Sequence, residues 1–250
     1  MITLIMSLNL RISLGCSSLR SFSQTRFLTR KSSSGQPDPR SPFVRAIDPN
    51  SLLKIPPGML AFHATGGHCE GPLLVNRGKN VIADIVATLG CLPQSSPVTT
   101  SEACTPPIVE VTSTFCAATG GVQWHRMFWP SLSLESRWYF DEPSQLAIDS
   151  FTYLGIRDFA AFGFALEPED APHTPDSGFV GFRHVTKKAW ILGVPVPLAL
   201  SLVADGVSMP HEDGLGWRVE VCVEHALLGT IVEYLGDVRL LPGEVSAPQN

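Results

Sequence analysis

The chain has 250 residues, of which 44% are hydrophobic and 16% are charged. This composition excludes a wholly disordered chain, a collagen-like chain and a long coiled coil, and it fits one domain of ordinary to large size. Residues 1–40 carry six basic and one acidic side chain, whereas residues 41–250 carry 12 basic and 22 acidic ones. Because this acidic body repels a phosphate backbone, we expect no nucleic-acid partner.

The first 37 residues contain no acidic residue and are rich in Ser and Arg, with apolar residues spaced among them. This composition is typical of an organellar transit peptide. Arg20, Phe22 and Thr25 also have the spacing of a mitochondrial presequence processing pattern. We therefore expect a mitochondrial protein. The nearest alternative is a chloroplast protein, and the remaining one is a cytoplasmic protein with a basic tail.

The composition changes again after this segment. Residues 31–50 are rich in Ser and Pro, which is typical of a linker. We expect residues 1–42 to form the transit peptide and a disordered linker, residues 43–242 a single domain, and residues 243–250 a disordered tail.

Two short helices are expected near the start of the domain. Pro56 and Pro57 open the first, and the glycine pair at 66–67 ends it. The second spans residues 80–89, with Asn80 as N-cap and Gly90 just after its end. Its apolar residues form one stripe that we expect to lie on the core: Val81, Ile82, Ile85, Val86 and Leu89.

Beyond residue 107 the pattern is that of strands. Apolar and polar residues alternate, and Gly, Pro or Asp interrupts the alternation at intervals. We expect an α+β, β-dominated fold: a curved antiparallel meander or barrel-like sheet of about eight to nine strands, with one or two short N-terminal helices packed on it. The expected strands are 108–117, 122–129, 132–140, 145–154, 157–166, 179–190, 198–207, 216–227 and 229–240. Residues 167–178 predict an exposed Pro-rich loop, and residues 193–197 a rigid bend at a sheet edge.

Membrane and disulfide signals are weak. The longest apolar stretch, residues 189–204, contains Gly193, Pro195 and Pro197 and is too short to cross a bilayer, so we expect no transmembrane segment. The six cysteines form no Cys-x-x-Cys pair. We therefore expect free thiols rather than a zinc ribbon or a disulfide framework.

Several short motifs follow one another between residues 43 and 241. They are Leu60-x-x-His63, Gly71-x-x-x-Val75-x-Arg77-Gly78, Leu89-Gly90-x-Leu92-Pro93, Trp124-x-Arg126-x-Phe128, Gly193-Val-Pro195-Val-Pro197 and Leu228-Gly229-x-x-Val232-x-Tyr234-x-Gly236. In this order and spacing the chain resembles the domain of unknown function 4166.

The resemblance implies no established activity. Members of that family occur alone or fused behind nicotinamide-dependent oxidoreductase modules, which implies an oxidoreductase partner. This chain has no Gly-x-Gly-x-x-Gly after a strand, so any dehydrogenase activity would need a separate protein. It departs from the family pattern at Asp237-Val238, where a Trp is expected, and in its long loop at 167–178. We expect no cofactor.

The best single site candidate is Arg126, which shares one strand face with Trp124 and Phe128. An Arg between two aromatic rings could hold a carboxylate or phosphate of a ligand. The alternative is a structural Arg that pairs with an acid such as Glu110 or Glu135. In either case a core-facing Arg needs compensation for its charge.

Other candidates are weaker. His225 continues the apolar face of the strand at 216–227 and could act as a general base or orient a ligand, or it is an ordinary core histidine. Tyr234 could orient a ligand if its hydroxyl is buried. The local cluster of His63, His68, Cys69 and Glu70 matches no zinc spacing, so we expect no metal.

Three hypotheses follow. The first is a binding module that holds a small apolar or amphipathic, or even anionic, ligand with Arg126 as its polar anchor. The second is an enzyme, or an accessory domain of an oxidoreductase, in which Arg126 and His225 share one cavity. The third is a protein-interaction module without a ligand.

Overall fold

The computed structural model describes residues 40–89, 95, 108–116, 118–128, 132–153, 155–170 and 178–241. The transit-peptide prediction and the C-terminal tail therefore lie outside the described residues, apart from Arg40 to Pro42. The helices are α2 (Pro42–Ala46), α3 (Pro49–Leu52), α4 (Pro57–Ala64) and α5 (Val81–Leu89), with a 3-10 turn η1 (Leu198–Leu200). The strands are β1 (Gly66–Arg77), β2 (Ile108–Cys116), β3 (Gly121–Phe128), β4 (Leu132–Asp141), β5 (Leu146–Tyr153), β6 (Ile156–Asp170), β7 (Val180–Ile191), β8 (Val194–Val196), β9 (Leu202–Pro210), β10 (Gly216–His225) and β11 (Gly229–Leu240).

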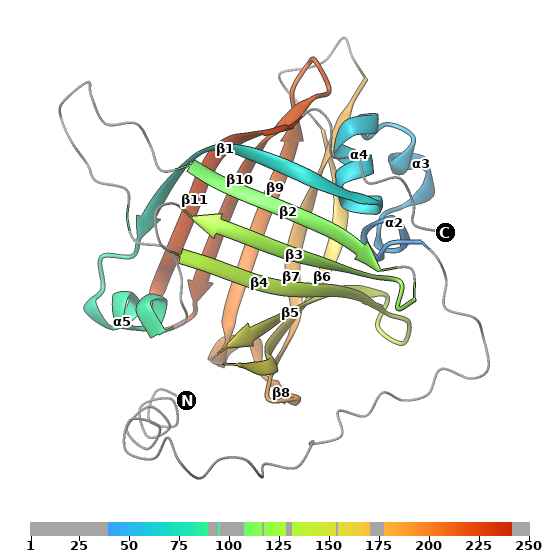
Figure 1. The fold of residues 1–250 in the computed structure, drawn as a ribbon. Coiled ribbons are helices and arrows are strands. Elements are labelled where there is room, and N and C mark those ends of the chain that lie inside the picture. The colour runs from blue at the N-terminus through green and yellow to red at the C-terminus, as the bar shows by residue number, and fades with distance from the viewer. Residues whose placement is uncertain are drawn as a thin grey trace, which may run out of the picture. The chain divides into compact units, whose positions relative to one another are not determined.

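Ten of these strands close into an antiparallel barrel (Figure 1). The sheet runs in the order β6, β5, β4, β3, β2, β1, β11, β10, β9, β7, and the pairing of β6 with β7 closes the ring. The short strand β8 extends β7 at an edge, where the Pro-rich bend was predicted. The β-dominated antiparallel fold predicted from the alternation is thus confirmed, with one strand more than the predicted range in the ring itself.

Helices lie near both ends of the barrel (Figure 1). α2 packs on β4 and β5, while α4 packs on β1 and on α2. α4 leads into β1 through Gly66, whose φ of 101° and close approach to the Ser113 carbonyl both require a residue without a side chain. α5 follows the other end of β1 and packs on β11. We call the end with α2 and α4 the helix end, and the opposite one the α5 end.

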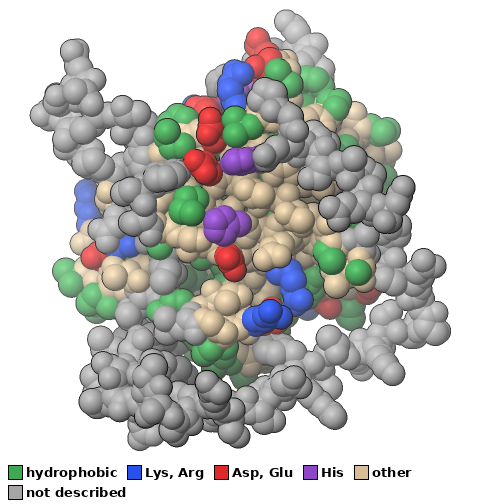
Figure 2. Space-filling view, viewed as in Figure 1, with side chains coloured by type: hydrophobic (Ala, Val, Ile, Leu, Met, Phe, Trp, Pro, Cys, Tyr) green, Lys and Arg blue, Asp and Glu red, His purple; other side chains and the backbone are tan. Residues whose placement is uncertain are grey.

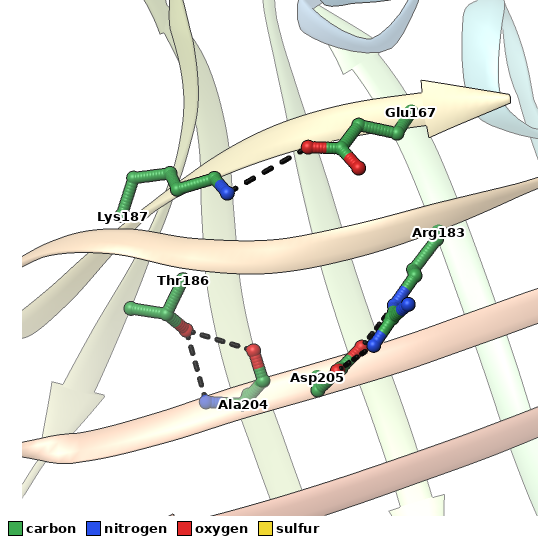
Figure 3. A network of polar contacts seen from close by, with 6 residues as sticks. All are labelled: Glu167, Arg183, Thr186, Lys187, Ala204 and Asp205. Carbon is green, nitrogen blue, oxygen red and sulfur yellow. Dashed lines mark hydrogen bonds and ion pairs between the residues drawn. The ribbon is translucent and has the colours of Figure 1, made fainter.

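A side chain extends the contact between β7 and β9, which we call the β7–β9 seam, beyond their backbone hydrogen bonds (Figure 3). The ladder of these two strands ends at the pair Val185 and Asp205. Beyond it, the Thr186 hydroxyl donates to the carbonyl of Ala204 at 3.0 Å and accepts from its N–H at 2.9 Å. On the outer side, Arg183 pairs with Asp205 in a two-pronged contact. The hydroxyl thus replaces a backbone pairing at a point where the ladder has stopped.

Three local predictions differ from the structure. β1 occupies a segment for which a glycine turn was expected. The helices α2 and α3 lie within residues 42–52, although residues 31–50 have the Ser- and Pro-rich composition of a linker. The loop expected at 167–178 begins later, because Glu167 to Asp170 continue β6 in register with β7. Residues 171–177 lie outside the described residues.

The orientation of α5 also corrects its predicted face. Ala83 and Ala87 are completely buried against Ile231, whereas Val81 and Ile82 are 74% and 47% exposed. The small alanine face lies against β11, where it allows the helix to approach closely. A polar contact from β1 is compatible with this orientation, since Arg77 donates to Asp84 at 2.8 Å and to Thr88 at 2.7 Å.

No helix in the described part of the chain is long and apolar enough to cross a membrane. Cys69, Cys116 and Cys222 have free thiols. The other three cysteines lie outside the described residues.

Candidate functional site

The inner wall of the barrel carries the face that was predicted to bind a ligand. On β3, Val122, Trp124, Arg126 and Phe128 alternate with residues that point outward. Val122 is fully buried and lies opposite Trp138 of β4, and the rings of Trp124 and Trp138 are 5.4 Å apart. The two aromatics and the Arg of the predicted face therefore all point into the barrel.

The helix end of the interior is filled by aromatic side chains. Phe43 of α2 and Phe62 of α4 enter the barrel and pack on Trp124 and Trp217. His63 sits in the middle of this cluster, with five aromatic rings centred within 5.7 Å of its own. Burial, with a smaller effect of His184, lowers the pKa of His63 to about 3. His63 is therefore neutral at physiological pH.

The other half of the interior is less tightly filled. Trp138, Trp217 and Val238 near the helix end are buried. Toward the α5 end the inner wall is mixed: Val75 and Val232 are buried, whereas other inward-facing residues are only partly buried. These partly buried residues include Val111, Phe128, Phe162, Val219, Val223 and Tyr234. Because they face inward, their partial exposure means that solvent reaches the inner wall in this half of the barrel.

An ion pair crosses the inner wall where the two halves meet. Arg126 Nη2 lies 3.3 Å from Oδ2 of Asp149, and the two side chains are only 14% and 4% exposed. The guanidinium also lies over the ring of Trp124, 4.8 Å from its centroid, and 5.8 Å from that of Phe151. The charge of Arg126 is thus compensated by Asp149, not by either of the two glutamates considered from the sequence.

The Asp149 carboxyl titrates close to neutral pH. Burial raises its pKa to about 6, and the nearby positive charge of Arg126 offsets this effect only in part. At pH 7 the group is mainly a carboxylate, and a carboxylate can only accept hydrogen bonds. Its second oxygen, Oδ1, is buried. The Ser136 hydroxyl lies close enough to lower the pKa of the carboxyl, but no described residue makes a hydrogen bond of normal geometry to Oδ1.

Other buried polar atoms near this pair also lack partners in the described part of the protein. They are the indole Nε1 atoms of Trp124 and Trp138, the hydroxyls of Ser113 and Ser136, and both ring nitrogens of His63. Ser136 lies opposite Trp124 in the ladder, and Trp138 lies opposite Asp149. Buried polar groups nearly always have a partner, so a group of them on one inner wall indicates a place for a bound molecule or water.

Two further titratable side chains complete the inner wall. His184 is partly buried, and this desolvation lowers its pKa to about 4; a Cβ on Gly206 would lie only 2.1 Å from its Nε2. Glycine at 206 therefore makes room for this ring. Tyr234 stacks on Phe128 at 6.1 Å, and burial raises the pKa of its hydroxyl far above the usual value. Both side chains are neutral near pH 7.

The structure brings together four of the five predicted residues, namely Trp124, Arg126, Phe128 and Tyr234. His225 lies at the end of β10, where its Nδ1 accepts the N–H of Leu227 at 3.2 Å in the turn to β11. Asp149, His63 and His184 were not predicted. The sequence alone does not single out Asp149, because a single acid in a strand is usually solvated. The available signal was that Ala147 and Phe151 flank it at a spacing of two.

The outer wall looks different from the inner one. In the view of Figure 2, acidic, basic, histidine and hydrophobic side chains are interspersed on the outer surface. No group of three or more His, Cys, Asp or Glu that could hold a metal ion occurs within the described ranges. The concentration of unpartnered polar atoms inside the barrel makes the interior the candidate site.

Comparison with known proteins gives one match. A family model described as "Domain of unknown function (DUF4166)" matches residues 56–238, a segment that reaches from α4 into β11 and includes Arg126 and Asp149. No curated protein and no solved structure matches the chain.

Proposed function

The chain belongs to the DUF4166 family, and we propose that its barrel is a binding module for one small molecule with an apolar body. The molecule enters from the α5 end and lies between the aromatic cluster and the partly exposed inner wall. The single observation that supports this proposal is the group of unpartnered buried polar atoms around the Arg126–Asp149 pair. A barrel of this kind can enclose one small ligand.

The lining suits a partly aromatic ligand. Trp124, Phe151 and Phe162 surround the ion pair, and the rings of the two phenylalanines are 5.9 Å apart. Aromatic side chains bury a ring over a large area, and a few polar groups then fix its orientation. Arg126 and Asp149 supply those polar groups here.

The enzyme hypothesis built on Arg126 and His225 has less support. The Arg126 guanidinium is held by Asp149 and two aromatic rings, and Nδ1 of His225 accepts a backbone N–H. An oxidoreductase partner remains an expectation from the family resemblance alone.

The test uses the full chain and a neutral apolar fluorescent probe, N-phenyl-1-naphthylamine. We expect saturable binding of one probe per chain with increased fluorescence. Val221→Trp places a large side chain on the inner wall beside Val219 and should abolish binding. The matched control is Glu220→Trp on the adjacent, outward position, which should leave binding unchanged. Probe binding that is absent, or that survives Val221→Trp, would contradict the proposal.

A native ligand gives a second readout. Gently purified protein is compared by native and denaturing mass spectrometry. We expect an additional mass that is lost on denaturation and is absent from the Val221→Trp variant. An additional mass that persists in that variant would place the ligand outside the barrel.

A further inference from the structure

We propose that the ligand of this site is an uncharged ring compound with a hydroxyl group, such as a phenol or a ring alcohol, and that this hydroxyl donates a hydrogen bond to Oδ1 of Asp149. The inference rests on the proposed binding function. An uncharged ligand replaces the anionic ligand that Arg126 alone suggested. The charges and the hydrogen-bonding capacities of the described residues support this change.

The first step is the charge at the site. Arg126 is compensated by Asp149, and Arg77, farther toward the α5 end, is compensated by Asp84 at 2.8 Å. The other titratable side chains of this region, His184 and Tyr234, are neutral near pH 7. An anionic ligand would therefore meet no uncompensated cation, and it would lie beside the Asp149 carboxylate in a region of low dielectric constant. Burial of a charge under these conditions is strongly unfavourable.

The second step is the hydrogen-bonding capacity of the unpartnered atoms. Oδ1 of the ionised Asp149 can only accept, so the group that contacts it must donate. The indole Nε1–H groups of Trp124 and Trp138 can only donate, so they require an acceptor. A hydroxyl both donates and accepts, and it carries no charge near neutral pH. A carboxylate offers acceptors only.

The third step is position. Trp138 lies directly opposite Asp149 across the β4–β5 ladder, and Trp138 and Trp124 are in ring contact. The acceptor oxygen and the two indole donors therefore belong to one small region of the inner wall. A ring that carries the hydroxyl has apolar surface to pack on in Phe151 and Phe162.

The experiment measures binding of three matched probes to the full chain by isothermal titration calorimetry near neutral pH. The probes are 4-ethylphenol, 4-ethylanisole, which lacks the donor, and 4-ethylbenzoate, which is an anion. A hydrogen bond to a charged group predicts that the phenol binds at least about tenfold more tightly than the anisole. We expect the benzoate to bind most weakly.

The variant Asp149→Asn tests the assignment to this carboxylate. It removes the negative charge and leaves Arg126 uncompensated, so the order of affinities should reverse in favour of the benzoate. The control Asp158→Asn changes an outward-facing ion pair with Arg137 and should leave the order unchanged. If Asp149→Asn does not fold, the double variant Arg126→Leu with Asp149→Asn replaces it. In that variant the advantage of the phenol over the anisole should disappear.

The outcomes separate this inference from the proposed function. If all three probes bind the original protein and the Val221→Trp variant excludes them, but the benzoate binds as tightly as the phenol, the barrel is a binding module and the inference is wrong. The inference is also wrong if Asp149→Asn keeps the original order. If none of the three probes binds, the inference is wrong; if N-phenyl-1-naphthylamine does not bind either, the proposed function fails as well.

Discussion

Arg126 and Asp149 form an ion pair across an intervening strand, since Arg126 lies on β3 and Asp149 on β5, with β4 between them. One carboxylate oxygen is held by the guanidinium at 3.3 Å and the other has no partner among the described residues. A buried pair of this kind is costly to break on one side only, because the remaining charge then has no counter-ion.

The coupling between the two side chains can be measured. We expect Arg126→Met to destabilise the fold by about 3–5 kcal/mol, because it leaves the Asp149 carboxylate buried and uncompensated. The double variant with Asp149→Asn should be more stable than Arg126→Met alone. Urea unfolding of the two single variants and the double variant gives the coupling energy. Additive effects would mean that the pair does not interact in solution.

Acid should destabilise the protein because of the histidines in its interior. Burial lowers the pKa of His63 to about 3 and that of His184 to about 4, both from 6.5, so below pH 6.5 the unfolded chain binds protons that the folded chain does not. Stability is therefore lost as the pH falls from 6.5 toward 4, by about 1.4 kcal/mol for each unit of pKa difference. Asp149, with its pKa raised from 3.8 to about 6, acts in the opposite direction between these two values, but one carboxyl does not outweigh two histidines.

The variant His63→Leu isolates the contribution of the aromatic cluster. It removes a ring whose nitrogens have no hydrogen-bond partner among the described residues, so no bond is lost. We expect a shallower fall of the unfolding free energy between pH 6.5 and pH 4 than in the original protein. The measurement is urea unfolding over this range, and an unchanged slope would contradict the buried, neutral state of His63.

The β7–β9 seam gives a further prediction. Thr186→Val keeps the shape of the buried side chain but leaves the N–H and carbonyl of Ala204 without the hydroxyl that contacts both. We expect a loss of about 2–3 kcal/mol in the unfolding free energy, since unsatisfied buried polar groups are costly. Thr186→Ser, which retains the hydroxyl, is the control and should lose less. Thermal or urea unfolding measures both, and a neutral Thr186→Val would mean that the strands pair without this contact.

The orientation of α5 can be tested with two substitutions two residues apart. Ala87→Leu adds volume to the face that is buried against Ile231 and should destabilise the fold by about 1–3 kcal/mol. Ile85→Gln changes an exposed position and should alter stability by no more than about 0.5 kcal/mol. The reverse order of effects would support the packing that the apolar stripe predicted.

The alternation of apolar and polar residues predicts a strand reliably wherever one face of the strand points into the barrel interior. The predicted strand 216–227 agrees with β10 within two residues, because four apolar side chains mark its inner face at every second position: Trp217, Val219, Val221 and Val223. β1 is not predicted from the sequence, because the glycine pair at 66–67 indicates the end of a helix and a turn rather than the start of a strand. In the barrel, Gly71 is required for close approach of two backbones, since a Cβ there would lie 1.8 Å from the carbonyl oxygen of Asp237. That contact exists only after distant strands have paired.

The site was predictable on one strand only. Trp124, Arg126 and Phe128 share a face that a single strand defines, so their common direction follows from local geometry. The partner of Arg126 depends on which strands lie two places apart in the closed sheet. From the sequence alone, Glu110 and Glu135 are therefore as reasonable as Asp149 as the partner of Arg126, because the order of the strands in the closed barrel is not known. The position of His63 inside the barrel is also not predictable from the sequence, because it depends on how α4 packs on the closed sheet.

The pairing of β1 with β11 joins residues 69–77 to residues 232–240. These contacts span most of the chain, so they give the fold a high contact order, and the ring cannot close until its last strand has been synthesised. Before that moment β1 and β10 present open edges that can pair with other chains. A chain that ends before Gly229 should therefore aggregate rather than form a smaller barrel, and during translation the nascent protein would depend on chaperones until β11 emerges.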